Sequence, residues 1–100
     1  MEIKNEVENK KFTTQVEGGE ARIAYRRGAG NSYDLVSTLV PYESRGKNIA
    51  DQLVREALKT AKQEGVSVIA TCPYVKHWFQ RHPEESSILF RMENEQRPSM

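Results

Sequence analysis

Two cationic side chains and a glycine stand directly before the most regular helical pattern of the chain. Residues 45–50 read Arg-Gly-Lys-Asn-Ile-Ala, and an apolar run at 39–41 precedes them. The first backbone N–H groups of a helix have no partner inside it and carry a positive partial charge, so this point can hold an anion. Arg45 and Lys47 add formal charge, and Gly46 lets the backbone approach a ligand closely. The spacing predicts a phosphate-binding turn.

The single cysteine, Cys72, is the second candidate for chemistry. It follows a short apolar run at 66–71 and precedes Pro73, which favours an extended backbone at Cys72 and ends the strand there. The thiol has three interpretations: it could accept an acyl group, give a proton to a leaving thiolate, or be an inert half-buried side chain. The sequence leaves all three open. One cysteine excludes an internal disulfide, which is typical of a reducing compartment.

Further along, histidine and aromatic side chains offer other roles. His77 and His82 could serve as a general base, because an imidazole titrates near neutral pH, although a surface or capping position explains both more simply. Their spacing matches no usual zinc arrangement, so no metal site is expected. Tyr74 could stack or hydrogen-bond beside a cofactor, whereas Trp78 and Phe79 are expected to anchor the core.

The elements that must position these residues follow from a pattern that changes once. Up to residue 40, apolar and polar residues alternate as in β-strands, with turn residues between the runs. The predicted strands are residues 2–7, 12–16, 21–26 and 33–39, and together they form an antiparallel meander. From Gly46 to Glu64 the apolar period becomes helical, and Gly65 ends the helix.

The second half of the chain predicts a β-α-β unit, in which a short strand at 66–71 follows the helix. Residues 73–82 predict a second, shorter helix. Residues 1–92 are expected to form one mixed α/β (α+β) domain, and residues 93–100 a flexible tail. Ligands in open α/β sheets sit beyond the carboxyl ends of the strands, and both the loop at 41–50 and Cys72 lie at such ends. We therefore expect them to face one site.

Length and charge exclude several classes of protein. The chain has 100 residues, enough for one domain with a single core. Its 15 basic and 14 acidic residues give a formal net charge of +1, so duplex DNA or an anionic membrane is not an expected partner. No apolar run approaches the roughly 20 residues of a membrane span, and the amino terminus lacks the apolar core of a signal peptide. These features predict a cytoplasmic protein.

Residues 45–50 resemble the acyl-CoA-binding signature of the GCN5-related N-acetyltransferases, in which Arg/Gln-x-x-Gly-x-Gly/Ala surrounds the pyrophosphate of coenzyme A. Asn48 stands where that family usually has its second glycine, and asparagine tolerates unusual backbone angles well. The runs at 39–41 and 71–75, with Trp78 and the pair His82-Pro83, extend the likeness. Roughly residues 10–84 resemble the small single-domain members of this superfamily, which have a reduced fold.

The resemblance implies that acetyl-CoA or coenzyme A binds in a V-shaped gap between the two strand ends at Val40 and Cys72. Cys72 is the implied catalytic residue. The predicted cofactor-binding residues are Leu39, Val40, Arg45, Gly46, Lys47, Asn48, Ile49, Ala50 and Tyr74. The implied reaction transfers acetyl to an amine, and the acceptor stays open among protein amino groups, polyamines and small amines.

Two other functions stay open from the sequence. The chain could be a non-catalytic module that binds or senses coenzyme A, because its loop lacks the second glycine of the signature. It could also be a protein-interaction domain that uses the aromatic carboxyl-terminal helix. The sequence does not indicate the oligomeric state.

Overall fold

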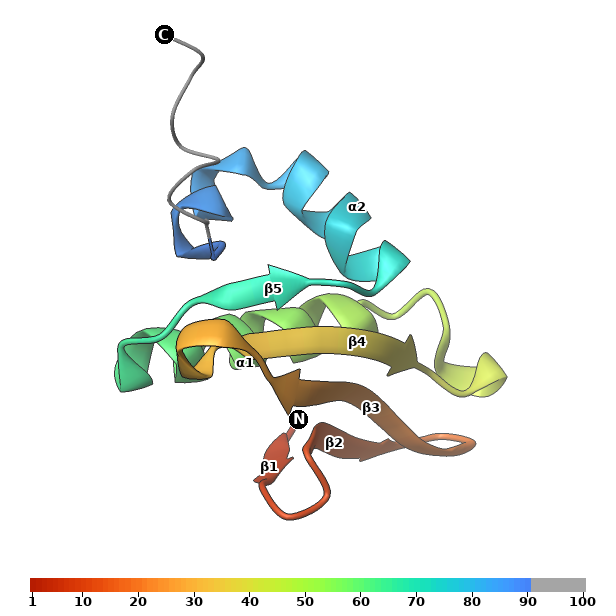
Figure 1. Cartoon of the computed structure of the whole chain (residues 1–100). Helices are drawn as coiled ribbons and strands as arrows, with labels where there is room; N and C mark the ends of the chain where they lie inside the picture. Colours follow the sequence, from red (N-terminus) through yellow and green to blue (C-terminus); the bar gives the residue numbers. More distant parts are fainter. Residues whose placement is uncertain (91–100) are drawn as a thin grey trace, which may run out of the picture.

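The strands form one five-stranded sheet in the order β1-β2-β3-β4-β5 (Figure 1). The computed structural model describes residues 1–90, so the flexible tail predicted at residues 93–100 lies outside the described residues. The strands are β1 (Lys4–Glu6), β2 (Lys11–Val16), β3 (Gly19–Arg27), β4 (Tyr33–Leu39) and β5 (Val68–Ala70). β1 to β4 pair antiparallel with their neighbours, and β5 pairs parallel with β4. The predicted meander is confirmed.

Helical segments complete the fold within residues 1–90. They are α1 (Ile49–Glu64), α2 (Pro73–Arg81) and the 3₁₀ turns η1 (Ala29–Asn31), η2 (Tyr42–Ser44) and η3 (Pro83–Ile88). Helix α1 joins β4 to β5 and lies across one face of the sheet, whereas α2 lies beyond β5 (Figure 1). The predicted β-α-β unit and the short second helix are therefore confirmed.

Helix α1 turns an apolar stripe toward the sheet. Its buried side chains are Leu53, Val54, Ala57, Leu58 and Ala61. Gly65 ends the helix as predicted, because its left-handed conformation lets its N–H donate to carbonyls of the last turn. The predicted start at Gly46 is wrong, since the helix begins at Ile49. Gly46 and Asn48 have positive φ angles of 82° and 63°, which a right-handed helix cannot contain.

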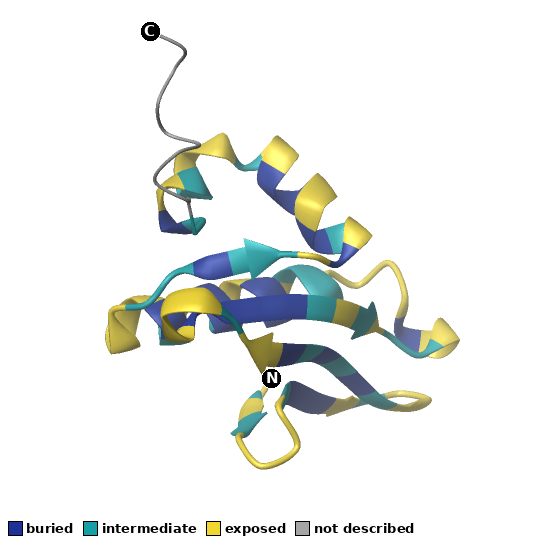
Figure 2. Ribbon diagram, in the orientation of Figure 1, coloured by how far each residue is buried: buried dark blue, intermediate teal, exposed yellow. Residues whose placement is uncertain are grey.

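The core lies between α1 and the sheet, where the buried residues of Figure 2 gather. Phe12, Ile23 and Leu35 of the strands are fully buried there. Trp78 and Phe79 of α2 are 1% and 7% exposed, which confirms them as core anchors. Because both rings are buried, α2 does not present them as an aromatic docking surface, and this weakens the interpretation as a protein-interaction domain.

Strand β4 contains a β-bulge that determines which side chains face α1. Successive residues of β3 pair with Ser37 and then with Leu35, so Val36 is the extra residue. The insertion shifts the usual alternation by one position, and Leu35 and Thr38 therefore point to the same side of the sheet. That side is the one covered by α1.

Candidate functional site

Strands β4 and β5 part where their pairing ends. The last paired residues are Leu35 and Ala70, while β4 continues to Leu39. The backbone N–H groups of Thr71 and Cys72 both donate to the Leu35 carbonyl, at 3.1 and 2.8 Å, and there the chain leaves the sheet to enter α2. The divergence leaves a gap at the carboxyl ends of the two strands, which is where the sequence predicted a shared site.

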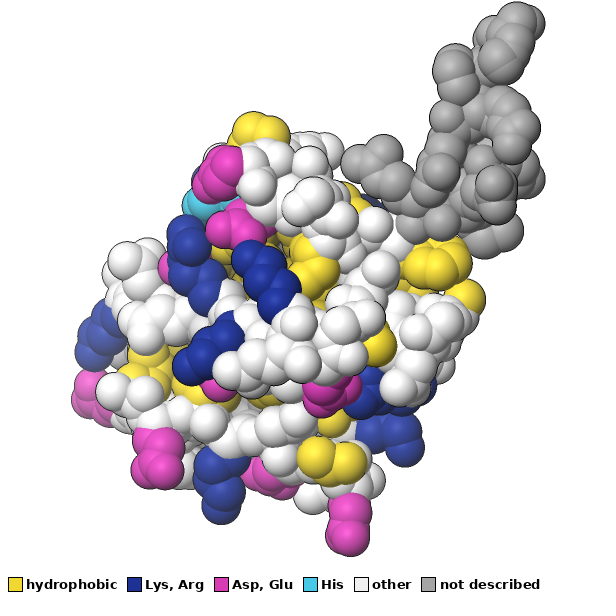
Figure 3. All heavy atoms as spheres, turned by 90° about the vertical axis from the view of Figure 1, so that its left-hand side faces the viewer, with side chains coloured by type: hydrophobic (Ala, Val, Ile, Leu, Met, Phe, Trp, Pro, Cys, Tyr) yellow, Lys and Arg dark blue, Asp and Glu magenta, His cyan; other side chains and the backbone are white. Residues whose placement is uncertain are grey.

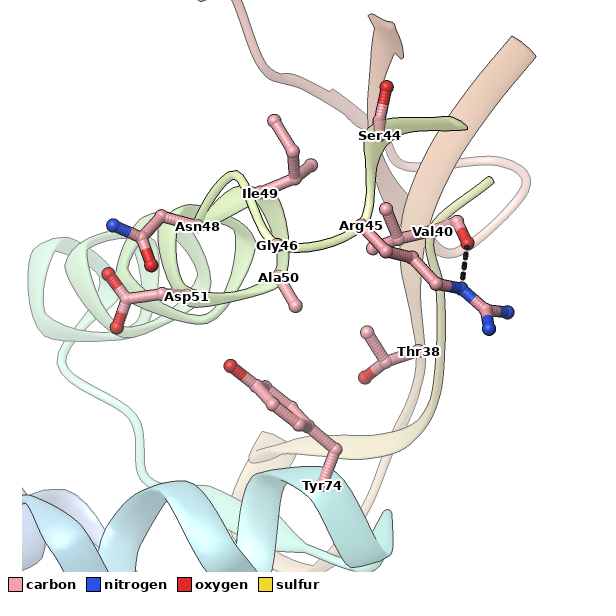
Figure 4. Close-up of a pocket in the computed structure, with 10 residues that line it drawn as sticks. All are labelled: Thr38, Val40, Ser44, Arg45, Gly46, Asn48, Ile49, Ala50, Asp51 and Tyr74. Carbon is pink, nitrogen blue, oxygen red and sulfur yellow. Dashed lines mark hydrogen bonds between the residues drawn. The ribbon is translucent and has the colours of Figure 1, made fainter. Parts of the chain in front are cut away.

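A pocket of about 430 Å³ lies at this gap (Figure 4). It is lined by Thr38, Val40, Ser44, Arg45, Gly46, Asn48, Ile49, Ala50, Asp51 and Tyr74. All of the predicted binding residues line it except Leu39 and Lys47. The volume falls within the range of about 300–1,000 Å³ that is usual for small-molecule sites.

The amino terminus of α1 opens onto this pocket. Asn48 is its N-cap, and within residues 1–90 the Asn48 side chain makes no capping hydrogen bond. A Cβ atom built on Gly46 would meet no other atom within 4 Å, so the space beside the loop is open. The first N–H groups of the helix are thus left without a side-chain cap, at the positive end of the helix dipole. This arrangement suits an anion.

The two predicted cations occupy different positions. Arg45 lines the pocket, but its side chain turns toward Val40, whose carbonyl accepts a hydrogen bond from Arg45 Nε at 3.1 Å (Figure 4). Lys47 lies outside the pocket lining, and its Nζ is 3.5 Å from Oε1 of Glu17. Leu39 also lies outside the lining and is 43% exposed. Both cations are exposed, so either can reorient at small cost.

The sequence did not single out an acidic side chain of this pocket, Asp51. Its Oδ1 accepts a hydrogen bond from Trp78 Nε1 at 2.7 Å, and its Oδ2 accepts one from Arg55 Nε at 3.0 Å. Burial opposes ionisation of the carboxyl, but these bonds outweigh it and lower the pKa of Asp51 below its usual value. Asp51 is therefore a charged carboxylate that ties α2 to the first turn of α1.

Tyr74, in the first turn of α2, extends its ring toward Ala50 and Asp51 (Figure 4). Burial, with a contribution from the charge of Asp51, raises the pKa of the Tyr74 phenol. The phenol is protonated at neutral pH, so it can donate a hydrogen bond or a proton into the pocket. Pro73 is the first residue of α2, where its missing N–H costs nothing. The start of the helix at Pro73 places Tyr74 in the first turn.

Cys72 lies next to the pocket rather than on its surface. The residue is 4% exposed and is the N-cap of α2. Its Sγ lies 3.4 Å from Oγ1 of Thr38, which itself lines the pocket. Thr38 therefore connects the thiol to the open space. The sequence could not indicate Thr38, because only the bulge at Val36 turns it to the α1 side.

A family comparison covers the whole of this site. A sequence profile described as GCN5-related N-acetyl-transferase matches residues 11–88, a range that includes every lining residue and Cys72. The chain belongs to the GCN5-related N-acetyltransferase family. The resemblance inferred from the residues is thereby confirmed, and the mixed α+β architecture agrees with a reduced form of that fold. Membership supports a general N-acetyltransferase function.

Neither histidine of this N-acetyltransferase-family domain lines the pocket. His77 is exposed on α2. The ring of His82 stacks on Trp78 with their centroids 4.1 Å apart, and its Nδ1 is 2.9 Å from the Trp78 carbonyl. Because a carbonyl only accepts, Nδ1 carries the proton in this contact. His82 thus has the capping position that the sequence suggested.

The face of the domain at the carboxyl end of α1 carries both signs of charge. Figure 3 shows lysine and arginine side chains interspersed with carboxylates on this face. Two of its ion pairs join Lys62 to Glu85 at 3.1 Å and Arg27 to Glu64 at 2.9 Å.

Along residues 1–90, none of the helices combines the length and the apolar character needed to cross a membrane.

Proposed function

We propose that this chain binds acetyl-CoA in the pocket and transfers its acetyl group to an amine. The observation that carries the proposal is the open amino terminus of α1, which faces the gap where β4 and β5 part. An anion site and an apolar strand end adjoin there, and a phosphate-bearing thioester needs both. Family membership is consistent with this substrate class.

The chain's own groups suit the anionic part of the donor. The N–H groups of the first turn of α1 would hold the pyrophosphate, with Arg45 beside them. Lys47 would assist, because an exposed ion pair such as the one with Glu17 contributes little and exchanges readily. Asp51 opposes an anion, but its hydrogen bond from Arg55 offsets its charge.

Acetyl-CoA supplies an acetyl group activated as a thioester: the amine nitrogen bonds to the acetyl carbon, the carbon–sulfur bond breaks, one proton leaves the amine and one reaches the departing sulfur. Tyr74 is the pocket's own proton donor, since its phenol is protonated and aimed inward. Cys72 is the second candidate donor and would act through Thr38, at the 3.4 Å contact of their side chains. The thiol is also the candidate carrier of a transient acetyl group.

The class of acceptor amine can be inferred from the absence of a free general base among the described residues that line the pocket. Among the described residues that line the pocket there is no histidine, and the one carboxylate, Asp51, already accepts two hydrogen bonds. At pH 7.4 an amine with a pKa near 8 is about 20% neutral, whereas a lysine amine is only about 0.1% neutral. We therefore propose an acceptor amine of low pKa, such as an α-amino group or a small amine whose pKa is also about 8.

A non-catalytic coenzyme A-binding module is the second candidate function. The burial of Cys72, at 4% exposure, is the observation that favours it, because a buried thiol has no direct access to a thioester in the pocket. In this alternative the pocket binds the same ligand without turnover.

Calorimetry with coenzyme A and an acetylation assay with acetyl-CoA and a small low-pKa amine test both candidates. We expect saturable binding by the wild type. We expect Tyr74→Phe to lower turnover by about 100-fold, the lower end of the usual range for acid–base catalysis, with coenzyme A affinity within about threefold. Cys72→Ala should also lower turnover at saturating acetyl-CoA.

The outcomes of these assays separate the candidates. Absence of coenzyme A binding contradicts both functions. Binding without transfer by the wild type leaves the non-catalytic module. Turnover that is undiminished in Cys72→Ala would return Cys72 to a packing role and leave Tyr74 as the proton donor.

A further inference from the structure

We infer that the turn of the β2–β3 hairpin, residues Glu17 and Gly18, positions the anion-binding loop and thereby sets its affinity for phosphates. The inference rests on the proposed function. This turn lies outside the pocket lining, at the end of the sheet where Figure 1 also shows η2. The turn would be a positioning segment that lies outside the signature at 45–50.

A partly buried hydrogen bond joins the loop to this turn. Ser44 is 2% exposed, and its Oγ donates to the Glu17 carbonyl at 2.8 Å, across 27 positions of sequence. The Ser44 N–H in turn donates to the Pro41 carbonyl at 2.9 Å, which closes η2. Lys47 adds a weaker link through its exposed pair with Glu17. The chain is thus held immediately before the open segment at Gly46.

The second contact is steric and depends on the absence of a side chain at Gly18. Gly18 has a φ of +94°, and a Cβ atom built on it would lie 2.9 Å from Cβ of Pro41 and even closer to the carboxylate of Glu43. The carboxylate can swing away, but the proline ring is rigid. The loop therefore packs directly against the glycine backbone of the turn.

Anchoring matters because the loop must present its N–H groups without help from a side-chain cap. A flexible loop loses conformational entropy when it orders around a ligand, and this loss reduces affinity. The contacts of Ser44 and Gly18 hold the chain in place just before Gly46 and Asn48, the two loop residues with positive φ. The same contacts should also slow the opening of its backbone in the absence of ligand.

The test compares Gly18→Ala with Gly19→Ala. Gly19 also has a positive φ, +129°, but a Cβ atom there meets nothing within 4 Å. Both substitutions strain the backbone of the same β2–β3 hairpin, and only Gly18→Ala pushes on the loop. We expect Gly18→Ala to weaken coenzyme A binding by about fivefold or more and Gly19→Ala to stay within about twofold, as measured by calorimetry below the unfolding transition.

Amide hydrogen exchange of residues 45–48 in the unliganded protein provides a readout that does not involve the ligand. Exchange should be faster in Gly18→Ala and unchanged in Gly19→Ala. Ser44→Ala removes the hydrogen bond to the Glu17 carbonyl without straining the turn, so it is a second variant for the case that Gly18→Ala does not fold, and its exchange should also be faster. Equal exchange and equal affinity in all variants would overturn the inference. A wild type that binds no coenzyme A would instead overturn the proposed function, and the exchange comparison would still decide whether the turn holds the loop.

Discussion

The two ends of α1 are built for different purposes. At the carboxyl end, Glu64 accepts hydrogen bonds from the Tyr33 hydroxyl at 2.6 Å and from Arg27 at 2.9 Å, and Gly65 caps the helix. At the amino end, the side chain of Asn48 makes no capping bond within the described part of the chain, and the helix opens onto a pocket. One end satisfies its own polar groups, whereas the other leaves backbone donors available to a ligand.

Electrostatics at the two ends differ in the same way. Burial, followed by the bond to Glu64, raises the pKa of Tyr33 to about 12. The bonds from Tyr33 and Arg27 lower the pKa of Glu64. This cluster is complete without any ligand. The amino end has exposed cations that are only weakly engaged, Arg45 and Lys47. We therefore expect substitutions at the carboxyl end of α1 to change stability and substitutions at its amino end to change ligand affinity.

The largest expected effect is on ligand affinity at the amino end. Arg45→Glu reverses the charge beside the proposed pyrophosphate position. Charged hydrogen bonds are worth about 1.5–3 kcal/mol, which corresponds to roughly a 10- to 100-fold weaker affinity for coenzyme A. Calorimetry measures the change, and thermal unfolding should show little loss of stability because Arg45 is exposed.

Lys59→Glu is the matched control for this charge reversal. Lys59 is exposed on the same helix, 11 positions beyond Asn48. At about 1.5 Å per residue it lies farther from the loop than the screening length of roughly 8–10 Å at moderate salt. The coenzyme A affinity of Lys59→Glu should therefore match that of the wild type. Equal affinities for Arg45→Glu and wild type, with both folded, would refute the placement of the anion site.

The next effect is on stability at the carboxyl end. Tyr33 is 1% exposed, so Tyr33→Phe removes a buried hydroxyl that bonds to Glu64 and Arg27. Because both partners can regain water, the expected loss is about 1–2 kcal/mol rather than the full cost of a buried unpaired charge. Thermal unfolding should shift down by roughly 4–8 °C per kcal/mol. A parallel loss of coenzyme A affinity would break the proposed separation of the two ends.

The contrast between the ends also explains what the sequence predicted. Periodicity revealed α1 and its Gly65 terminus, because each depends on residues within a few positions of each other. The start at Gly46 was wrong because helical spacing does not report the backbone angles of Gly46 and Asn48. Thr38 was missed because a bulge is a property of strand pairing. Asp51 was missed because one of its hydrogen-bond donors, Trp78, lies on a different helix, and spacing along the sequence does not reveal that contact.

A pH dependence of stability provides a smaller test of the carboxyl end. Because the pKa of Glu64 is lower in the folded protein, its contribution is present above the usual glutamate value of 4.5 and is lost as the pH falls through the folded value. Urea unfolding should find Glu64→Gln less stable than wild type near about pH 7, with the difference shrinking toward about pH 3. Glu56→Gln, on the same helix, is the control. A difference that stays constant with pH would contradict the assignment.

The smallest expected effect concerns Asn48, where the family signature has glycine. Asn48 adopts φ 63°, which glycine reaches without a steric penalty and alanine reaches at a cost of about 1 kcal/mol or more. Its side chain extends away from Thr38 in Figure 4, so we expect no essential contact with a ligand. Asn48→Gly should therefore leave coenzyme A affinity within about threefold or tighten it, whereas Asn48→Ala should weaken it through backbone strain. If calorimetry instead found clear weakening in Asn48→Gly, the asparagine side chain would be a ligand contact, and the open end of α1 would depend on a side chain as well as on its backbone.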